Sequence, residues 1–309
     1  MSSSHKKATM KDIAKAAQVS VATVSYVLNC APNQTIPAET KQRVLETAKE
    51  LQYVPNLAAR SLIKNRTGLV GILVNRSRDE RWWEQLAISR DVDALERGLT
   101  RLGYHVVLAS LDADNPNMAV ISERKLDAVF VLGAKEQTFH DISVHFSAGV
   151  PLIVVNSYID DPLFYKIVYD YERAVDSALT KQPDHRSFLI MDRLSQGAGE
   201  ALCSQLSLSS SQVLVLEDER QLPDFLMSQQ GSGIILNEGI AVLAARWMES
   251  PRFTTLCTAG CPELLHALPG SAYVSFGDGK AQSSIALMQA LLNEQTDPPA
   301  EKYMRIKPL

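Results

Sequence analysis

The chain has little cysteine and no long apolar run. Four of its 309 residues are cysteine, namely Cys30, Cys203, Cys257 and Cys261. Three residues separate Cys257 from Cys261, but no second pair of metal ligands accompanies them. We therefore predict buried, reduced thiols in a cytoplasmic protein, with no disulfide and no metal. No stretch approaches the roughly 18 apolar residues of a membrane span, and the N-terminus lacks the apolar segment of a signal peptide, so no membrane partner is expected.

Motifs typical of catalysis are absent as well. The chain contains no GxSxG, GxxxxGK[ST] or HExxH pattern. The segment GSG at 231–233 precedes an apolar run, whereas a phosphate-binding loop follows a strand. His140 and His145 are five residues apart, which puts them on different faces of a helix. The Asp-Asp pair at 160–161 precedes a proline in a predicted turn. The sequence therefore predicts neither an enzyme nor a cofactor.

Charge is distributed unevenly along the chain. The net charge of −4 does not by itself suggest a nucleic-acid partner. Residues 1–66, however, hold ten Lys/Arg and four Asp/Glu, whereas residues 67–309 hold twenty-one and thirty-one. A basic arm on an acidic body is typical of a protein that contacts phosphates at one end only.

Two short helices joined by a tight turn are predicted within residues 9–29. Thr9 and Asp12 have the spacing of a capping box at the start of a helix over 10–17. Ser20 suits the N-cap of a second helix over 21–29. The predicted inward faces are Ile13, Ala16 and Ala17 in the first helix, and Val24, Val27 and Leu28 in the second. Such a pair makes a helix-turn-helix, whose second helix suits the major groove of DNA.

A third helix is predicted over 37–52, where Pro37 suits the first turn and Val44, Ala48 and Leu51 follow helical spacing. It would pack across the first two helices and complete a domain over 1–53.

These segments resemble the start of the lactose-repressor (LacI/GalR) family of bacterial transcription regulators. The resemblance rests on MKDIAKAAQVSVATVSYVLN at 10–29 and KQRVLETAKELQYVPNLAARSL at 41–62. It implies a sequence-specific DNA-binding regulator, a repressor of transcription, that binds double-stranded operator DNA. Positions that match phosphate contacts in the family are Ser20, Thr23, Ser25 and Asn29, and those that match base readers are Val21, Ala22 and Tyr26. Tyr26 departs from the arginine frequent in the family, and arginine reads guanine with two hydrogen bonds.

The resemblance also identifies residues 54–66 as a hinge helix and linker. A helix of about two turns is marginal in water, so we expect it to form only when packed against a partner. In the family it forms on operator DNA, pairs with its dimer mate and inserts a leucine into the minor groove. The matching residues are Asn56, Ala59 and Leu62. A plain linker, with Leu62 packed on the body, is the alternative.

Residues 67–309 alternate apolar runs with helical stretches. The runs at 69–74, 104–110, 127–132 and 151–156 predict one series of buried parallel strands, and those at 166–170, 186–191, 212–216, 231–236 and 254–259 a second. Further runs at 272–276 and 302–308 close the fold. The predicted fold is an α/β body of two doubly wound parallel-sheet lobes, periplasmic-binding-protein-like, behind the all-α helix-turn-helix domain. We assign lobe 1 to about 67–157 plus about 276–292, and lobe 2 to about 158–275 plus about 293–309.

A ligand of such a body would bind between the lobes, at the carboxyl ends of the strands. The resemblance points to Trp82 or Trp83 as a ring facing a small-molecule effector and to Asn237 as a ligand-binding amide. Asn156 and Gln196 replace a frequent aspartate and an arginine that holds the effector, and Pro262 replaces a further aspartate. The cleft is thus expected to keep amides and lose charges. A sugar, another metabolite, a protein partner or no ligand at all remain open.

The resemblance further implies a homodimer on a pseudo-palindromic operator, because one helix-turn-helix reads one half-site. The sequence ends after a predicted strand without leucine heptads, which favours a dimer over a tetramer. The alternatives are a DNA-binding regulator controlled by a protein partner and, more remotely, a solute-binding protein or an enzyme.

Overall fold

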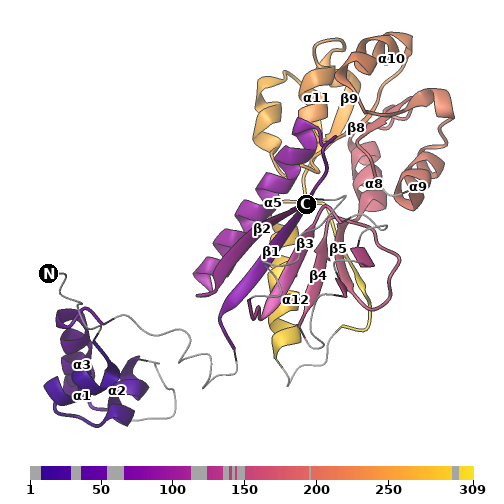
Figure 1. Cartoon of the computed structure of the whole chain (residues 1–309). Helices are drawn as coiled ribbons and strands as arrows, with labels where there is room; N and C mark the ends of the chain where they lie inside the picture. The colour runs from indigo at the N-terminus through magenta and orange to yellow at the C-terminus, as the bar shows by residue number, and fades with distance from the viewer. Residues whose placement is uncertain are drawn as a thin grey trace, which may run out of the picture. The chain divides into compact units, whose positions relative to one another are not determined.

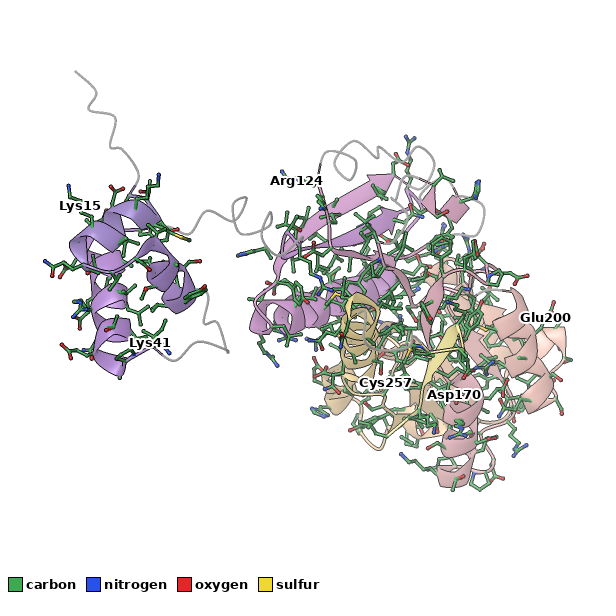
Figure 2. All side chains as sticks on the ribbon, turned by 90° about the horizontal axis from the view of Figure 1, so that it is seen from below. Lys15, Lys41, Arg124, Asp170, Glu200 and Cys257 are labelled. Atoms are coloured by element: carbon green, nitrogen blue, oxygen red, sulfur yellow. The ribbon has the colours of Figure 1, made fainter. Side chains whose placement is uncertain are left out.

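A computed structural model describes residues 8–28, 36–53, 66–112, 124–134, 139–140, 143–144, 150–194, 196–293 and 299–309. The chain separates into two compact units, Met1–Thr67 and Gly68–Leu309 (Figure 1). Lys15 and Lys41 lie on the surface of the first unit, whereas Cys257 is buried in the second (Figure 2). Cys261 is buried too, Cys203 is half-buried, and Cys30 lies outside the described residues.

The first unit is formed by three helices, α1 (Met10–Ala16), α2 (Val21–Leu28) and α3 (Ala38–Glu50). Their apolar faces meet in one small core, which consists of Ile13, Ala14, Ala17, Val24, Val27, Val44 and Ala48. This arrangement confirms the predicted inward faces, with two exceptions. Ala16 and Leu51 are exposed, and Ala14 is buried in place of Ala16, because the face of α1 that meets the other helices is rotated toward Ala14.

The turn between α1 and α2 is held by local hydrogen bonds. Thr9 and Asp12 form the predicted capping box of α1. Gln18 adopts a left-handed conformation, with φ 53°, and the amide of Val19 donates to the carbonyl of Ala14 at 3.0 Å. The hydroxyl of Ser20 accepts from the amide of Thr23 at 3.0 Å and so caps α2. These hydrogen bonds join residues that are close in sequence, so the local sequence determines the path of the backbone from α1 to α2.

The second unit contains a six-stranded parallel sheet with strand order β11-β5-β4-β3-β1-β2. The strands are β1 (Leu69–Arg76), β2 (His105–Asp112), β3 (Ala128–Leu132), β4 (Leu152–Val155), β5 (Tyr165–Tyr169) and β11 (Tyr303–Ile306). Helices α5 (Trp82–Arg101) and α12 (Gly279–Leu292) pack against each other and against this sheet (Figure 1). Together they form lobe 1.

A five-stranded parallel sheet forms lobe 2, with strand order β10-β9-β8-β6-β7. Its strands are β6 (Leu189–Met191), β7 (Val213–Val215), β8 (Gly233–Leu236), β9 (Phe253–Leu256) and β10 (Ala272–Val274). Its helices are α8 (Tyr171–Lys181), α9 (Gln196–Leu206), α10 (Leu222–Ser228) and α11 (Glu238–Ala244). The predicted fold class is therefore confirmed: an all-α domain precedes two parallel-sheet α/β lobes.

The predicted boundaries of the lobes were wrong at two strands. β5 was assigned to lobe 2, but it pairs with β4 in lobe 1, with Ile153 opposite Tyr165. β11 was assigned to lobe 2 as well, but it pairs with β5, with Tyr303 opposite Lys166. A buried strand reads as the same apolar run in either sheet, so the pattern identifies the strand and not its neighbours. The chain enters lobe 2 only after β5, at α8, and returns after β10.

Candidate functional site: a helix-turn-helix and an inter-lobe cleft

The outward face of α2 consists of apolar and hydroxyl side chains. Val21 is 43% exposed and Tyr26 40% exposed, and Ala22 lies between them on the surface. Ser20 is exposed, and its hydroxyl lies 2.9 Å from that of Thr23, whereas Ser25 is half-buried. The helix carries no acidic residue in its first turn and no basic residue in its last. The face can therefore approach DNA without repelling phosphates.

The remaining DNA-contact predictions fall on Asn29, Asn56, Ala59 and Leu62. All four lie outside the described residues, so they stay predictions.

A cleft of about 680 Å³ opens between the two lobes of the second unit. Its walls come from the carboxyl ends of strands in both sheets, as predicted. The lining residues at these strand ends are Asn75 in β1, Gly133 after β3, Asn156 after β4, Asp192 after β6 and Thr258 after β9. The first turns of α5 complete it. This volume suits a small molecule.

The cleft is rich in carboxylates, contrary to the expectation that it loses charges. Five of them line it, namely Asp79, Glu80, Glu84, Asp91 and Asp192, beside two guanidinium groups, those of Arg81 and Arg193. Sequence reasoning missed these residues. A usable pattern was present, since RDERWWE follows β1 and DR follows β6, and parallel strands place such residues at one edge.

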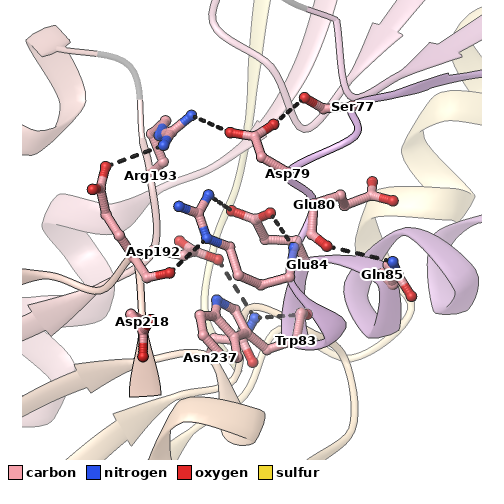
Figure 3. Close-up of polar contacts among 12 residues, drawn as sticks. Ser77, Asp79, Glu80, Trp83, Glu84, Gln85, Asp192, Arg193, Asp218 and Asn237 are labelled. Carbon is pink, nitrogen blue, oxygen red and sulfur yellow. Dashed lines mark hydrogen bonds and ion pairs between the residues drawn. The ribbon is translucent and has the colours of Figure 1, made fainter. Parts of the chain in front are cut away.

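Several polar contacts join the lobes at the mouth of the cleft (Figure 3). Arg193, after β6, pairs with Asp79 of lobe 1 at 3.4 Å and, within lobe 2, with Glu217 at 3.1 Å. Arg81, before α5, donates from Nε to the carbonyl of Glu217 at 3.0 Å. These groups hold the two lobes in the observed arrangement.

Asp192 is a carboxylate of the cleft whose pKa is raised by a large amount. Burial raises its pKa to about 6, the negative charge of Glu84 adds to the rise, and the hydrogen bond from Asn237 opposes it. The Asn237 Nδ2 atom lies 3.5 Å from Asp192 Oδ2. The side chain thus carries a charge that the surrounding protein disfavours.

Lys280 of α12 lies behind the lining and pairs with Asp91 of α5, with 2.8 Å between Nζ and Oδ2. Its ammonium also lies 4.3 Å from the centre of the Tyr169 ring. Burial disfavours the charge of Lys280, but the attraction of Asp91 and Tyr169 outweighs it and keeps its pKa above the ordinary value. This pair fastens the two helices of lobe 1 together at the cleft.

The two tryptophans do not present a ring to the cleft, which corrects the expectation for Trp82 and Trp83. Trp83 is 1% exposed and packs among the core residues of lobe 2, with Ile235 and Ile240. Trp82 is 43% exposed, is not part of the lining, and donates from Nε1 to Glu219 at 2.8 Å. The Trp82 ring and the Cβ atom of Trp83 lie close to Gly239, at the start of α11, where a larger residue would leave less room for either tryptophan.

Asn237 is also a buried residue that does not belong to the lining of the cleft. It is fully buried, adopts φ 77°, and accepts from the amide of Gly239 at 2.9 Å, which caps α11. Its Nδ2 donates to the carbonyl of Trp83 at 3.2 Å (Figure 3). Asn237 therefore positions α5 and Asp192 and does not line the cleft, contrary to its predicted contact with a ligand.

Of the other predicted effector residues, Asn156 does line the cleft, in a left-handed conformation with φ 57°. Gln196 begins α9, but its side chain lies outside what the structure describes, so its role stays a prediction. Pro262 begins a short 3-10 turn after β9 and is not among the lining residues.

No helix in the described ranges has the length and apolarity that a membrane crossing needs. Within the same ranges, no three His, Cys, Asp or Glu side chains gather in a way that could hold a metal ion.

Residues 9–56, which include the whole of the helix-turn-helix, match the family model of bacterial regulatory proteins, lacI family. Over these residues the chain is similar to the lacI family. An HTH-type transcriptional regulator of Lachnoclostridium phytofermentans is 31% identical over 178 residues, which cover 55% of this chain and 51% of that protein. The HTH-type transcriptional repressor PurR of Vibrio cholerae serotype O1 is 32% identical over 129 residues, covering 40% of this chain and 36% of PurR. The chain thus matches about half the length, or less, of these curated relatives.

Solved structures with the same fold include transcription regulators in complex with ligands. The lac repressor dimer bound to operator and the anti-inducer ONPF superposes with a TM-score of 0.69 at 16% identity, covering 98% of this chain and 97% of that one. A complex of the regulator CelR with cellobiose gives a TM-score of 0.59 at 17% identity, with 98% of each chain covered. At these identities the likeness concerns the fold alone.

Proposed function

We propose that this protein is a DNA-binding transcription regulator, acting as a repressor, that binds a pseudo-palindromic operator as a homodimer and responds to a small molecule in the inter-lobe cleft. The observation that carries the proposal is the outward face of α2, within a helix-turn-helix whose sequence matches the lacI family. The lac repressor, which shares the fold, was solved as a dimer on its operator.

The outward face of α2 suggests how sequence would be read. Phosphate contacts supply affinity and register, and short hydroxyl groups such as those of Ser20 and Thr23 suit that task. Val21 and Ala22 can only make apolar contacts, for instance with thymine methyl groups. Tyr26 offers one hydroxyl and a ring where a guanine-reading arginine would offer two donors. We therefore expect an operator half-site read mainly through thymine methyls and shape.

The hinge would complete the operator complex. In the proposed mechanism, residues 54–66 fold on DNA, Asn56 and Ala59 contact the backbone, and Leu62 inserts into the minor groove. Asn29, at the end of the recognition helix, would contact a phosphate. The hinge leads directly into β1 of lobe 1, so a ligand that shifts the lobes would change the spacing of the two hinges in a dimer.

Control by a small molecule is supported by the position and volume of the cleft. Both lobes supply its lining, so a ligand would change how the lobes meet. Coupling of this kind is typically 1–3 kcal/mol, roughly 5–150-fold in operator affinity.

Selection from a random pool of duplex DNA tests the proposal. We expect enriched sequences with two-fold-related half-sites, and light scattering that gives a dimer at micromolar concentration. Tyr26→Ala should weaken binding to the enriched sequence by about ten-fold or more, since a base contact is worth roughly 1–3 kcal/mol. Leu45→Ala is the matched control, because Leu45 is 47% exposed on α3. Absence of paired half-sites, or an unchanged affinity of Tyr26→Ala, would reject the assignment.

A further inference from the structure

One carboxylate of the cleft has no cation beside it among the described residues. Four of the five lining carboxylates are within ion-pair distance of a Lys or Arg: Asp79 with Arg193 (3.4 Å), Glu80 with Arg76 (2.9 Å), Glu84 with Arg81 (3.6 Å) and Asp91 with Lys280 (2.8 Å). Asp192 pairs with no Lys or Arg in the described ranges, and its side-chain partner is the amide of Asn237, at 3.5 Å. A long amide contact is a poor replacement for the hydration that a carboxylate loses on burial.

Two further polar atoms of the lining are unsatisfied within the described part of the chain. They are Asn75 Oδ1 and Thr258 Oγ1, which are buried and make no hydrogen bond. Asn75 is 3% exposed and Thr258 6% exposed, and both line the cleft. The Asn75 Nδ2 atom already donates to the carbonyl of Gly133 at 3.2 Å, which leaves an acceptor unused. Unpaired acceptors on Asn75 and Asp192 call for a ligand that donates hydrogen bonds.

The aromatic residues of the wall suit the same kind of ligand. Tyr158 and Tyr171 both line the cleft, and their rings stack with centroids 6.4 Å apart. Burial, and after it the negative charge of Asp192, raises the pKa of Tyr171 well above its ordinary value, and both side chains line the cleft. A cation held by Asp192 would therefore also meet the face or edge of an aromatic wall.

We propose that the cleft binds a cationic metabolite, a small molecule whose protonated amine pairs with Asp192 and whose other donors meet Asn75 and Thr258. This rests on the proposed function only in taking the cleft as the effector site. The five lining carboxylates face four cations, counting Arg76 and Lys280 behind the lining, and Arg193 also pairs with Glu217, so a positive charge on the ligand offsets an excess of negative charge. A neutral polyol would leave the half-buried charge of Asp192 without a counterion, and an anion would face a net negative cleft.

Isothermal titration of the full chain with matched pairs of compounds tests the proposal. The probes are D-glucosamine with D-glucose, and putrescine with 1,4-butanediol, each up to about 10 mM, a range typical of weak metabolite affinities. We expect at least one amine to bind at least about ten-fold more tightly than its uncharged partner, as a charge-assisted hydrogen bond requires. Asp192→Asn, which keeps the shape and removes the charge, should weaken that amine by about ten-fold or more. Asp224→Asn, which removes an exposed carboxylate on α10, should leave it unchanged.

Equal binding of the uncharged partner, an unaltered affinity in Asp192→Asn, or no binding of either amine at the highest concentration would overturn the proposal. Operator binding of the ligand-free chain is measured in parallel. If DNA binds and no amine does, the ligand class is wrong and the regulator stands. If an amine binds through Asp192 and DNA affinity does not respond, the ligand class stands and the proposed coupling fails.

Discussion

Replacing Trp83 with alanine is expected to destabilise the body strongly, whereas the same change at its neighbour is expected to be mild. Trp83 is 1% exposed and fills the core of lobe 2, although it belongs to α5, whose Leu95 and Leu99 lie in the core shared with lobe 1. Truncation of a buried tryptophan costs about 3–5 kcal/mol. The indole Nε1 is buried and makes no hydrogen bond within the described residues, so its removal offsets part of the loss. We therefore expect about 3 kcal/mol, at the lower end of this range.

Urea denaturation of the full chain, followed by circular dichroism, measures this loss as a lower midpoint of the body's transition. Trp82→Ala is the control, because Trp82 is 43% exposed and its bond to Glu219 lies at the surface. That variant should lose about 1 kcal/mol or less, as surface changes do. Trp83→Phe should stay within about 1.5 kcal/mol of the parent, since it keeps a buried ring and removes the unpaired N–H group.

The packing assignment would be refuted if the two alanine variants lost the same stability, or if Trp82→Ala lost more. A third result is equally decisive. If Trp83→Ala kept its stability and lost only affinity for a ligand, then Trp83 would face the cleft in solution, as the family resemblance suggested.

The remaining predictions concern pH, salt and the hinge. The pKa of Asp192 is raised to about 6 in the folded chain, so folding favours the protonated form of this side chain. Its contribution to the free energy of unfolding is therefore fully present below the unfolded pKa near 4 and is lost as the pH rises through 6. Asp192→Asn should therefore stabilise the ligand-free chain at pH 8 by about 2–3 kcal/mol relative to its effect at pH 4, a difference that urea titrations at the two pH values measure. The affinity for an amine should rise between pH 4 and pH 8 in the parent and stay flat in Asp192→Asn. The other ionisable groups that face this position are Glu84 of α5, Glu238 of α11, Tyr171 of α8 and the adjacent Arg193. A flat profile in the parent would mean that Asp192 does not hold the ligand. Operator affinity should fall about 10³-fold or more between about 50 and 200 mM salt if some 6–10 phosphates are contacted. A nearly flat salt dependence in a filter-binding series would mean that the basic arm does not contact DNA. Leu62→Ala should weaken operator binding much more than binding to random DNA, and equal losses on both would favour the plain linker.

Local chemistry determined much of this protein directly. The caps of Thr9 and Ser20 act within three residues of chain, so the sequence predicted the start of both helices and, through helical spacing, the outward position of Val21 and Tyr26. The apolar runs likewise predicted every strand of the two sheets. Central strands such as β3, β4 and β8 are buried on both faces and therefore apolar throughout, whereas an edge strand such as β2 is apolar only in part.

Only tertiary structure decided which strands share a sheet and which side chains meet. β5 and β11 read as ordinary buried strands. β5 takes its place in lobe 1 by pairing with β4, and β11 by pairing with β5 across more than a hundred residues of chain. Trp82 and Trp83 are adjacent and chemically identical, and the close approach of Gly239 and the core of lobe 2 buries one of them. The charge of the cleft arises in the same way: Glu84 and Asp192 are distant in sequence, and their effect on each other exists only where the ends of two sheets converge, because electrostatic interaction depends on separation in space and on burial.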